Sequence, residues 1–308
     1  MPDTAAPLIH LGPSHDATLA RGIERGGGVL VPLEQAEAVV WGNGPDTFPE
    51  RLPDAVRWVQ LPSAGIERWF AAGIVDERRV WTSAAGAYAR NVAEHAVLLL
   101  LAGVRALPGQ ARATSWRKAE FDPAVGTLYG ATVAIIGCGG IGRAMIPLLT
   151  AFGADVLAVT RSGTPVPGVA ETVTADRTAE LWSRADHFVV AAPATAETAR
   201  LVDAGALAAM KSTAWVVNIA RGSLIDTDAL VAALRAGTIG GAALDVTDPE
   251  PLPEGHPLWT LPNALITPHL ANPGTGLTGF LADHVAENVA RFAAGQPLLA
   301  LVEPERGY

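Results

Sequence analysis

Short apolar runs separated by glycine and proline clusters characterise the first third of the chain. The runs Ala38–Trp41, 56–61 and Val80–Thr82 are each followed by a glycine-containing segment. This pattern is typical of buried strands joined by turns and helices. The stretch 91–104 has no helix breaker before Gly103, and we expect a long apolar helix there.

From about residue 132 onward, predicted strands and helices alternate regularly. Segments such as 141–152 and Thr227–Ala236 favour helices between apolar runs that read as buried parallel strands. The predicted strands cover residues 133–136, 156–160, 187–191, 215–219, 241–246 and 264–267. Strand and helix in this order predict a doubly wound, parallel-sheet Rossmann domain.

A further predicted helix, at 276–294, follows after this α/β pattern has finished. We therefore expect an α/β fold with two domains, the first of them discontinuous. Residues 1–97 and 276–308 would form a smaller, flavodoxin-like substrate or catalytic domain. Residues 98–275 would form the Rossmann nucleotide-binding domain.

A glycine-rich turn joins the first strand of the predicted Rossmann domain to its first helix. The motif G-x-G-x-x-G is formed by Gly137, Cys138, Gly139, Gly140, Ile141 and Gly142. With 32 glycines in the chain, an ordinary glycine-rich turn is the alternative reading. The position directly after an apolar strand and before a helix instead favours a dinucleotide site, with the pyrophosphate at the helix N-terminus.

The end of the next predicted strand indicates which dinucleotide is bound. An NAD site usually has an acidic residue there, about 20 residues after the motif, to hold the ribose hydroxyls. This sequence has Thr160, Arg161 and Ser162 instead, and no acid. Arg161 and Ser162 suit a 2′-phosphate, so we expect NADP to be favoured over NAD, unless Arg161 merely faces solvent.

Polar residues follow three later strands, at the strand ends where doubly wound sheets bind ligands. Arg221 comes after the strand at 215–219, Glu250 after the one at 241–246, and His269 after the one at 264–267. Taken singly, each has an ordinary explanation: Arg221 as a strand-end arginine, Glu250 as a solvated loop acid and His269 as a turn histidine. Together they form a set suited to acid–base chemistry on an anionic substrate.

At this point the chain resembles the D-isomer-specific 2-hydroxyacid dehydrogenase family, which includes glyoxylate/hydroxypyruvate reductases. The resemblance extends from about Trp58 to Phe292. Its most specific pieces are 92–95, the glycine motif, 218–226, 243–251 and Thr267-Pro268-His269. It implies an NAD(P)-dependent oxidoreductase that interconverts a small 2-oxo acid and its D-2-hydroxy acid.

The resemblance also implies a catalytic triad of Arg221, Glu250 and His269. His269 would give the proton that the new hydroxyl needs, because imidazole titrates near neutral pH. Glu250 would orient the ring, and Arg221 would bind the substrate carboxylate and polarise the carbonyl with its planar charged fork. The remaining histidines are read as structural, and His95 is expected inside the long helix.

Further site residues are implied by the same resemblance. Cofactor contacts are expected from Pro193, Ala220, Asp245 and Asn272, with Asp245 at the nicotinamide carboxamide. The loop Ser63-Ala64-Gly65 is expected to hold the substrate carboxylate through backbone N–H groups, unless it is a plain turn.

The sequence departs from the family pattern beside the triad and leaves alternatives open. Thr247 and Asp248 stand where a Phe-containing form is common, and Asn272 stands where Gly or Trp is common. No feature selects one oxo acid. A formate- or phosphite-oxidising relative is one alternative, although formate enzymes pair the histidine with Gln rather than with an acid such as Glu250. A dinucleotide-sensing, corepressor-like binding protein is the other.

Composition narrows the partners that are expected. A net charge of −9 argues against nucleic acid and anionic membranes, and no metal is expected. The single cysteine, Cys138, excludes an internal disulfide framework and fits a reducing compartment. Residues 1–11 lack signal-peptide features. We therefore expect a cytoplasmic protein. The resemblance implies a homodimer formed through the α/β domain, and the arm at 110–127, which is too polar for a core, fits this expectation.

Overall fold

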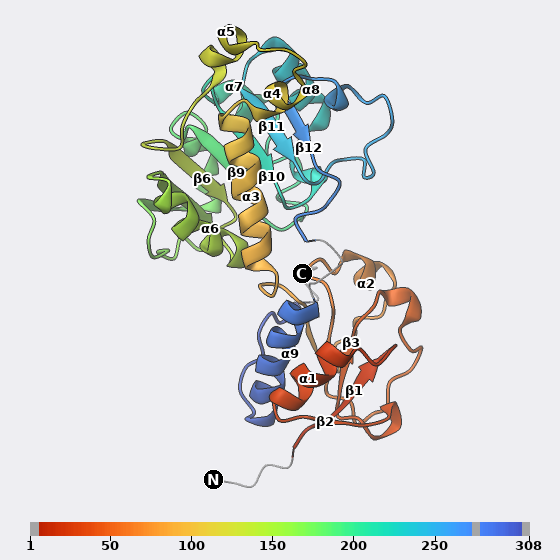
Figure 1. Ribbon diagram of the computed structural model, residues 1–308. Coiled ribbons are helices and arrows are strands. Elements are labelled where there is room, and N and C mark those ends of the chain that lie inside the picture. Colours follow the sequence, from red (N-terminus) through yellow and green to blue (C-terminus); the bar gives the residue numbers. More distant parts are fainter. Residues whose placement is uncertain (1–5, 273–277, 304–308) are drawn as a thin grey trace. The chain divides into compact units, whose positions relative to one another are not determined.

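The computed structural model describes residues 6–272 and 278–303, and its contacts divide the chain into two compact units (Figure 1). Unit 1 comprises Met1–Tyr88 and Pro273–Tyr308, and unit 2 comprises Ala89–Asn272. The expected boundary at residue 97 falls inside α3 (Ala89–Val104). This single uninterrupted helix belongs whole to unit 2, because it packs on the α6 helix and the sheet of that unit.

Unit 1 is built on a five-stranded parallel sheet with the order β2-β1-β3-β4-β5. This is the strand order of flavodoxin-like folds. Its strands are β1 (Leu8–Gly12), β2 (Val29–Leu30), β3 (Ala38–Trp41), β4 (Trp58–Gln60) and β5 (Val80–Thr82).

Helices cover both faces of this sheet. Its helices are α1 (Ala17–Arg25), α2 (Glu67–Ala71) and α9 (Thr278–Ala293). α1 and α9 pack side by side on one face (Figure 1), over a core that includes Ile9, Val40 and Trp58. α2 packs on the other face, where its Trp69 joins Trp81 of β5.

Unit 2 contains a seven-stranded parallel sheet with the order β12-β11-β10-β9-β6-β7-β8. Counted within the unit, this is the Rossmann order 3-2-1-4-5-6 with one more strand at the edge. Its strands are β6 (Thr132–Ile136), β7 (Asp155–Thr160), β8 (Glu171–Thr174), β9 (His187–Val190), β10 (Trp215–Asn218), β11 (Gly241–Leu244) and β12 (Ala264–Ile266). The expected α/β fold class is confirmed in both units.

The helices of unit 2 lie on the two faces of its sheet. They are α3, α4 (Leu107–Arg112), α5 (Lys118–Phe121), α6 (Gly140–Ala151), α7 (Ala204–Ala209) and α8 (Thr227–Ala236). α3 and α6 cover one face, and α7 and α8 pack on the opposite face (Figure 1). α8 has sharp ends, because the Asp226 carboxylate caps its first turn and Gly237 follows its last turn with φ +66°.

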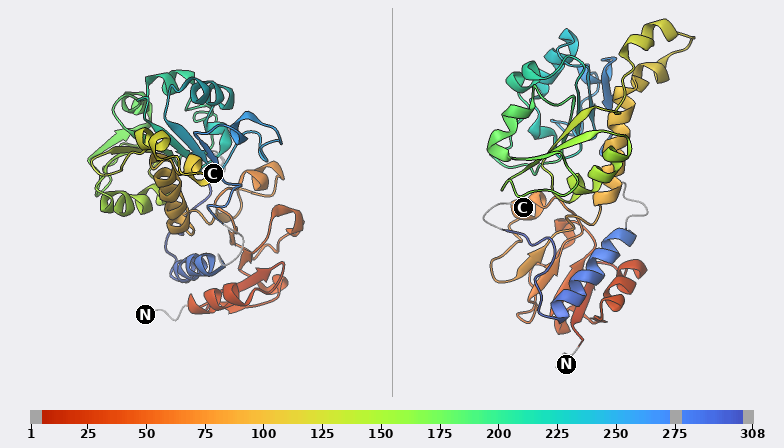
Figure 2. Two further views of the ribbon diagram at one scale, coloured as in Figure 1. Left: turned by 45° about the horizontal axis from the view of Figure 1, so that its top comes forward. Right: turned by 90° about the vertical axis from the view of Figure 1, so that its left-hand side faces the viewer.

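Several elements differ from the sequence prediction. The pattern did not predict β1, the two-residue β2, β8 or α1. The arm expected to be irregular holds the short helices α4 and α5, and Figure 2 shows this segment, drawn in yellow, projecting from the rest of unit 2. The predicted helix 276–294 is observed from Thr278, and its first two positions lie outside the described residues. Within the described ranges, no helix is long and apolar enough to cross a membrane.

Candidate functional site

One row of paired residues marks the carboxyl edge of the seven-stranded sheet. The strand register aligns Val159, Ile136, Val190, Asn218, Leu244 and Ile266 across β7, β6, β9, β10, β11 and β12. Each segment expected to carry cofactor or catalytic residues in unit 2 follows this row directly. The parallel register therefore brings to one edge of the sheet residues that are up to about 130 positions apart.

The glycine turn after β6 has the shape that a dinucleotide pyrophosphate requires. Gly137 has φ +93°, and a Cβ there would lie 2.4 Å from the Ala192 backbone. A Cβ on Gly139 would meet nothing within 4 Å, so the space above this residue is open to a ligand. Gly139 is also the N-cap of α6 and supplies no side-chain cap, which leaves the first N–H groups of the helix available for an anion.

The third glycine of the motif has a packing role. A Cβ on Gly142 would approach Cys138 Sγ to 3.0 Å and Ile135 Cγ2 to 3.1 Å, so the helix lies tightly against the strand. Gly140 and Ile141 form the first turn of α6 with Gly142. With these contacts, the residues of the motif have the geometry that a dinucleotide site needs.

Two buried polar atoms at this edge have no hydrogen-bond partner among the described residues. They are Thr160 Oγ1, at the end of β7, and Asn272 Oδ1. Buried polar groups are nearly always hydrogen-bonded, so unpartnered atoms at two of the expected cofactor positions fit a ligand that supplies the partners. Ser162, which follows the strand, exchanges a 2.7 Å hydrogen bond with Thr164, and Arg161 beside it is exposed.

His269 and Glu250 form a hydrogen-bonded pair. His269 Nδ1 lies 2.7 Å from Glu250 Oε1, and the two side chains are 49% and 41% exposed. Because a carboxylate only accepts, the imidazole donates from Nδ1 and leaves Nε2 to face a reactant. The second Glu250 oxygen accepts from the Thr247 N–H at 3.4 Å, which holds the carboxylate from its other side.

The turn that carries Arg221 is braced by Asn218, which is buried. The Asn218 amide donates to the Arg221 carbonyl at 2.8 Å and accepts from the Ala220 N–H at 3.0 Å. Arg221 Nη1 donates to the Ala220 carbonyl at 2.7 Å. A Cβ on the next residue, Gly222, would lie 2.0 Å from the Thr247 carbonyl, so the Arg221 turn and the Glu250 loop are in direct contact.

Asp245 is buried, with its side chain only 1% exposed, and holds the loop that carries His269. Its Oδ1 accepts from Thr267 Oγ1 at 2.6 Å and from the Leu270 N–H at 2.8 Å, and its Oδ2 accepts from the Ala271 N–H at 2.9 Å. Burial opposes ionisation, but hydrogen bonds from His95, Thr267 and the two backbone N–H groups outweigh it. They lower the pKa of Asp245 from 3.8 to about 2.

The remaining expected residues lie on two loops. Pro193 follows β9, and its carbonyl accepts from Thr198 Oγ1 at 2.6 Å. In unit 1, Ser63 Oγ donates to the Gly65 carbonyl at 2.7 Å and shapes a tight turn. No hydrogen bond within the described parts of the chain uses the N–H of Ala64 or Gly65.

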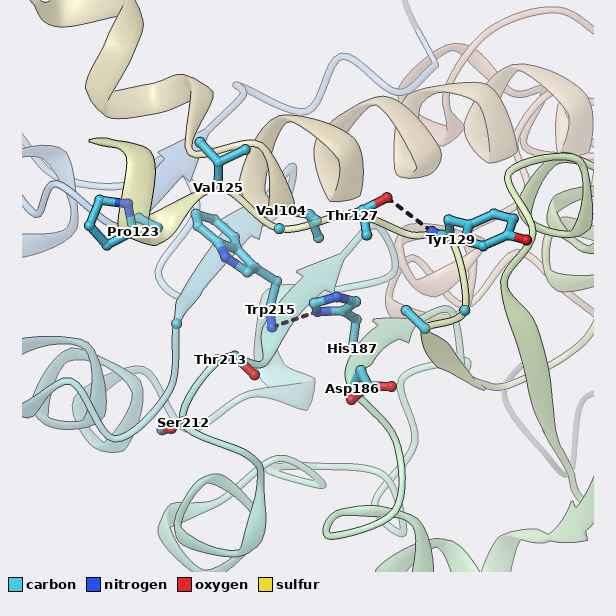
Figure 3. A pocket seen from close by; sticks show the side chains of 15 residues that line it. Val104, Pro123, Val125, Thr127, Tyr129, Asp186, His187, Ser212, Thr213 and Trp215 are labelled. Atoms are coloured by element: carbon cyan, nitrogen blue, oxygen red, sulfur yellow. Dashed lines mark hydrogen bonds between the residues drawn. The ribbon is translucent and has the colours of Figure 1, made fainter. Parts of the chain in front are cut away.

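A cavity of about 610 Å³ lies at the opposite, amino-terminal edge of the same sheet (Figure 3). His187 and Trp215, the first residues of β9 and β10, line it, and His187 Nδ1 accepts from the Trp215 N–H at 3.2 Å. Burial lowers the His187 pKa to about 4, so this ring is neutral near pH 7. None of the expected site residues lines this cavity. Over residues 6–272 and 278–303, no cluster of His, Cys, Asp and Glu is placed to hold a metal ion.

Comparison with known proteins identifies the family. The family model for the NAD binding domain of D-isomer specific 2-hydroxyacid dehydrogenases matches residues 95–271, which is more than half of the chain. The chain belongs to the D-isomer specific 2-hydroxyacid dehydrogenase family. It is thus an NAD(P)-dependent oxidoreductase, and the expected family and enzyme class are confirmed.

Individual relatives agree over most of the chain. The "uncharacterized protein in proB 3'region" of Corynebacterium melassecola is 40% identical over 289 residues, which covers 93% of this chain and 95% of the relative. A glycerate dehydrogenase of Methylorubrum extorquens is 36% identical over 220 residues, or 68% of each chain. A D-isomer specific 2-hydroxyacid dehydrogenase from Xanthobacter autotrophicus Py2, solved with NADPH and MES, has a TM-score of 0.82 at 27% identity. That match covers 99% of this chain and 100% of the solved one.

Sequence reasoning missed the residues that support the predicted site. Asn218 and Thr267 stand inside the quoted motifs, and their places next to strand ends were the available signal. His95 was read as structural, although it stands inside the quoted motif 92–95, and its neighbours in the sequence do not indicate which distant residues it faces. Only the packing of α3 on the sheet shows this contact.

Proposed function

We propose that this dehydrogenase interconverts a small 2-oxo acid of the glyoxylate and hydroxypyruvate class and its 2-hydroxy acid, with NADP favoured over NAD. The observation that carries the proposal is the 2.7 Å hydrogen bond between His269 Nδ1 and Glu250 Oε1. This acid–base pair lies at the same sheet edge as the dinucleotide turn. The glycerate dehydrogenase relative supports the substrate class, because glycerate is the 2-hydroxy acid of hydroxypyruvate.

The three residues have distinct tasks in this reaction. The nicotinamide, when bound, supplies the hydride for the 2-carbon. His269 acts from its doubly protonated form: it keeps the Nδ1 proton that it donates to Glu250, gives its Nε2 proton to the carbonyl oxygen, and is left as neutral imidazole. Arg221 binds the substrate carboxylate and polarises the carbonyl, and in the reverse direction His269 is the base. Formate oxidation forms no hydroxyl and needs no such pair, so the pair supports carbonyl–alcohol chemistry.

A substrate panel tests the proposed reaction. NADPH or NADH is mixed with the protein and glyoxylate, hydroxypyruvate, pyruvate, phenylpyruvate or 2-oxoisocaproate, and the loss of reduced-nicotinamide absorbance is followed. We expect turnover with glyoxylate or hydroxypyruvate, faster with NADPH. Cofactor binding by fluorescence without turnover of any oxo acid would contradict the proposal.

The cofactor preference depends on the residues after β7. We expect Arg161→Ala to weaken NADPH binding by about tenfold or more, because a charge-assisted contact to the 2′-phosphate contributes about 1.5–3 kcal/mol. NADH has no 2′-phosphate, so its Kd should change by less than about twofold. Fluorescence titration of both cofactors gives the two Kd values. Equal losses for NADPH and NADH would exclude Arg161 as the selecting residue.

The other expectations stay predictions that the geometry supports. The N–H groups of Ala64 and Gly65 can act as an anion site for the substrate carboxylate. Trp116 in the projecting arm is 93% exposed, which suits a contact with a second copy in the expected homodimer, and sedimentation equilibrium measures this state. The cytoplasmic location rests on the single cysteine.

A further inference from the structure

His95 reaches the catalytic edge of unit 2 from the helix α3. Its Nε2 lies 3.1 Å from Thr267 Oγ1 and 3.2 Å from Asp245 Oδ1, and its side chain is only 17% exposed. Thr267 is 172 residues further along the chain. The contact therefore joins the first helix of the unit to the segment that leaves its last strand.

The surrounding groups determine the protonation of this nitrogen. Asp245 is ionised and can only accept, and Thr267 donates its hydroxyl proton to Asp245 Oδ1. The Thr267 oxygen is therefore also an acceptor toward His95. Because both neighbours accept, Nε2 of His95 carries a proton and donates to them.

Asp245 in turn holds the backbone of the residue that carries the acid–base ring. His269 has φ +54°, in the left-handed region, where a residue with a Cβ costs roughly 1–2 kcal/mol. Three successive N–H groups stabilise this turn: that of His269 donates to the Asp245 carbonyl at 2.8 Å, and those of Leu270 and Ala271 donate to the Asp245 carboxylate. The Leu270 and Ala271 N–H groups form a nest around the carboxylate.

We propose that His95 is a positioning residue for the acid–base group. By donating to Asp245 and Thr267, it fixes the carboxylate that holds the backbone of residues 270 and 271, directly after His269, and so it fixes the place of the His269 ring. This inference rests on the proposed function, in which His269 transfers the proton. It assigns a role in the reaction to His95, a residue that the sequence analysis had read as purely structural.

The kinetic test compares His95→Leu, His95→Gln and wild type with hydroxypyruvate and NADPH. We expect His95→Leu to lower kcat by about 10- to 100-fold, because a shift of about 1 Å at the reacting group costs this much. KM for hydroxypyruvate should stay within about twofold, because the substrate contacts are unchanged. His95→Gln keeps an N–H donor near the Nε2 position, so its kcat should recover to within about threefold of wild type.

His187→Leu is the matched control. It removes a buried imidazole that stands at the start of β9, at the opposite edge of the sheet on which α3 packs, and it should lower Tm and leave kcat unchanged. The proposal is overturned if His95→Leu keeps a kcat within about threefold of wild type, if His95→Gln is as slow as His95→Leu, or if His187→Leu slows turnover equally.

Nuclear magnetic resonance of the histidine rings separates this inference from the proposed reaction. In ¹H–¹⁵N correlation spectra we expect His95 to carry its proton on Nε2, and His95→Leu to move the ring signals of His269, which His187→Leu leaves in place. If wild type turns over neither glyoxylate nor hydroxypyruvate, the proposed function fails. The ring spectra then still decide whether His95 positions the His269 ring. Coincident His269 signals in wild type and His95→Leu would refute it.

Discussion

His269→Ala is expected to lower kcat by about 10³-fold or more, because a positioned proton donor contributes about 10²–10⁴-fold and water replaces it poorly. The ring that is lost donates from Nδ1 to Glu250, and its Nε2 is the atom to which we assign the proton transfer. NADPH binding should persist with a Kd within about twofold of wild type, since the glycine turn and the α6 N-terminus are untouched. Stopped-flow absorbance and NADPH fluorescence give the two quantities.

His256→Ala is the control for this substitution. The His256 ring also lies in unit 2, where its Nδ1 accepts from the Leu258 N–H, but it belongs to no expected site. Its kcat should match wild type. The kcat of Glu250→Gln should lie between those of His269→Ala and His256→Ala. An amide oxygen still accepts from Nδ1, but the charge that stabilises a protonated ring is lost. A kcat of His269→Ala within a few-fold of wild type would remove His269 from the mechanism.

Gly222→Ala is expected to have the second largest effect, although the added group is one methyl. The new Cβ would lie 2.0 Å from the carbonyl carbon and oxygen of Thr247 and 2.4 Å from the Asp248 nitrogen. These are backbone atoms, so a rotamer change cannot relieve the overlap. The loop that ends in Glu250 must move away from the turn that holds Arg221, and kcat/KM should fall by about 100-fold or more.

Stability should fall as well, by about 1–3 kcal/mol in the free energy of unfolding, as expected for overpacking. Gly205→Ala makes the same change in α7, where the new methyl meets no backbone atom within 4 Å and only the Asp203 Oδ1 that caps the helix, at 3.3 Å. This control should keep wild-type kcat/KM and unfold at wild-type temperature or slightly above, because alanine favours a helix over glycine. Wild-type kcat/KM in Gly222→Ala would show that the two loops do not depend on each other.

The local pattern of the sequence was enough to predict the Rossmann unit and to place the candidate site residues at one edge of its sheet. Apolar runs of four or more residues mark buried parallel strands, and the register confirms that their ends share one edge. A residue just after such a run, such as Arg221 or His269, must lie at that edge whatever the rest of the chain does. The glycine motif is local as well, since the positive φ of Gly137 and the contacts of Gly142 with Cys138 and Ile135 involve only the motif and the strand before it.

Features that depend on pairing between distant segments could not be read in this way. The strand β2 has two residues and no periodicity, and it exists because β1 pairs with it. The boundary between the units lies before α3, because α3 packs along its length on the sheet of unit 2.

The sequence by itself determined which residue types stand at the carboxyl ends of the strands, and with them the family, the cofactor turn and the candidate triad. Only the tertiary structure decided what supports them. It shows Asp245 buried under the His269 loop, Gly222 against Thr247, and His95 of α3 donating to Asp245. Hydrogen bonds and steric contacts of this kind act over a few ångströms, whereas the residues that make them are up to 172 positions apart.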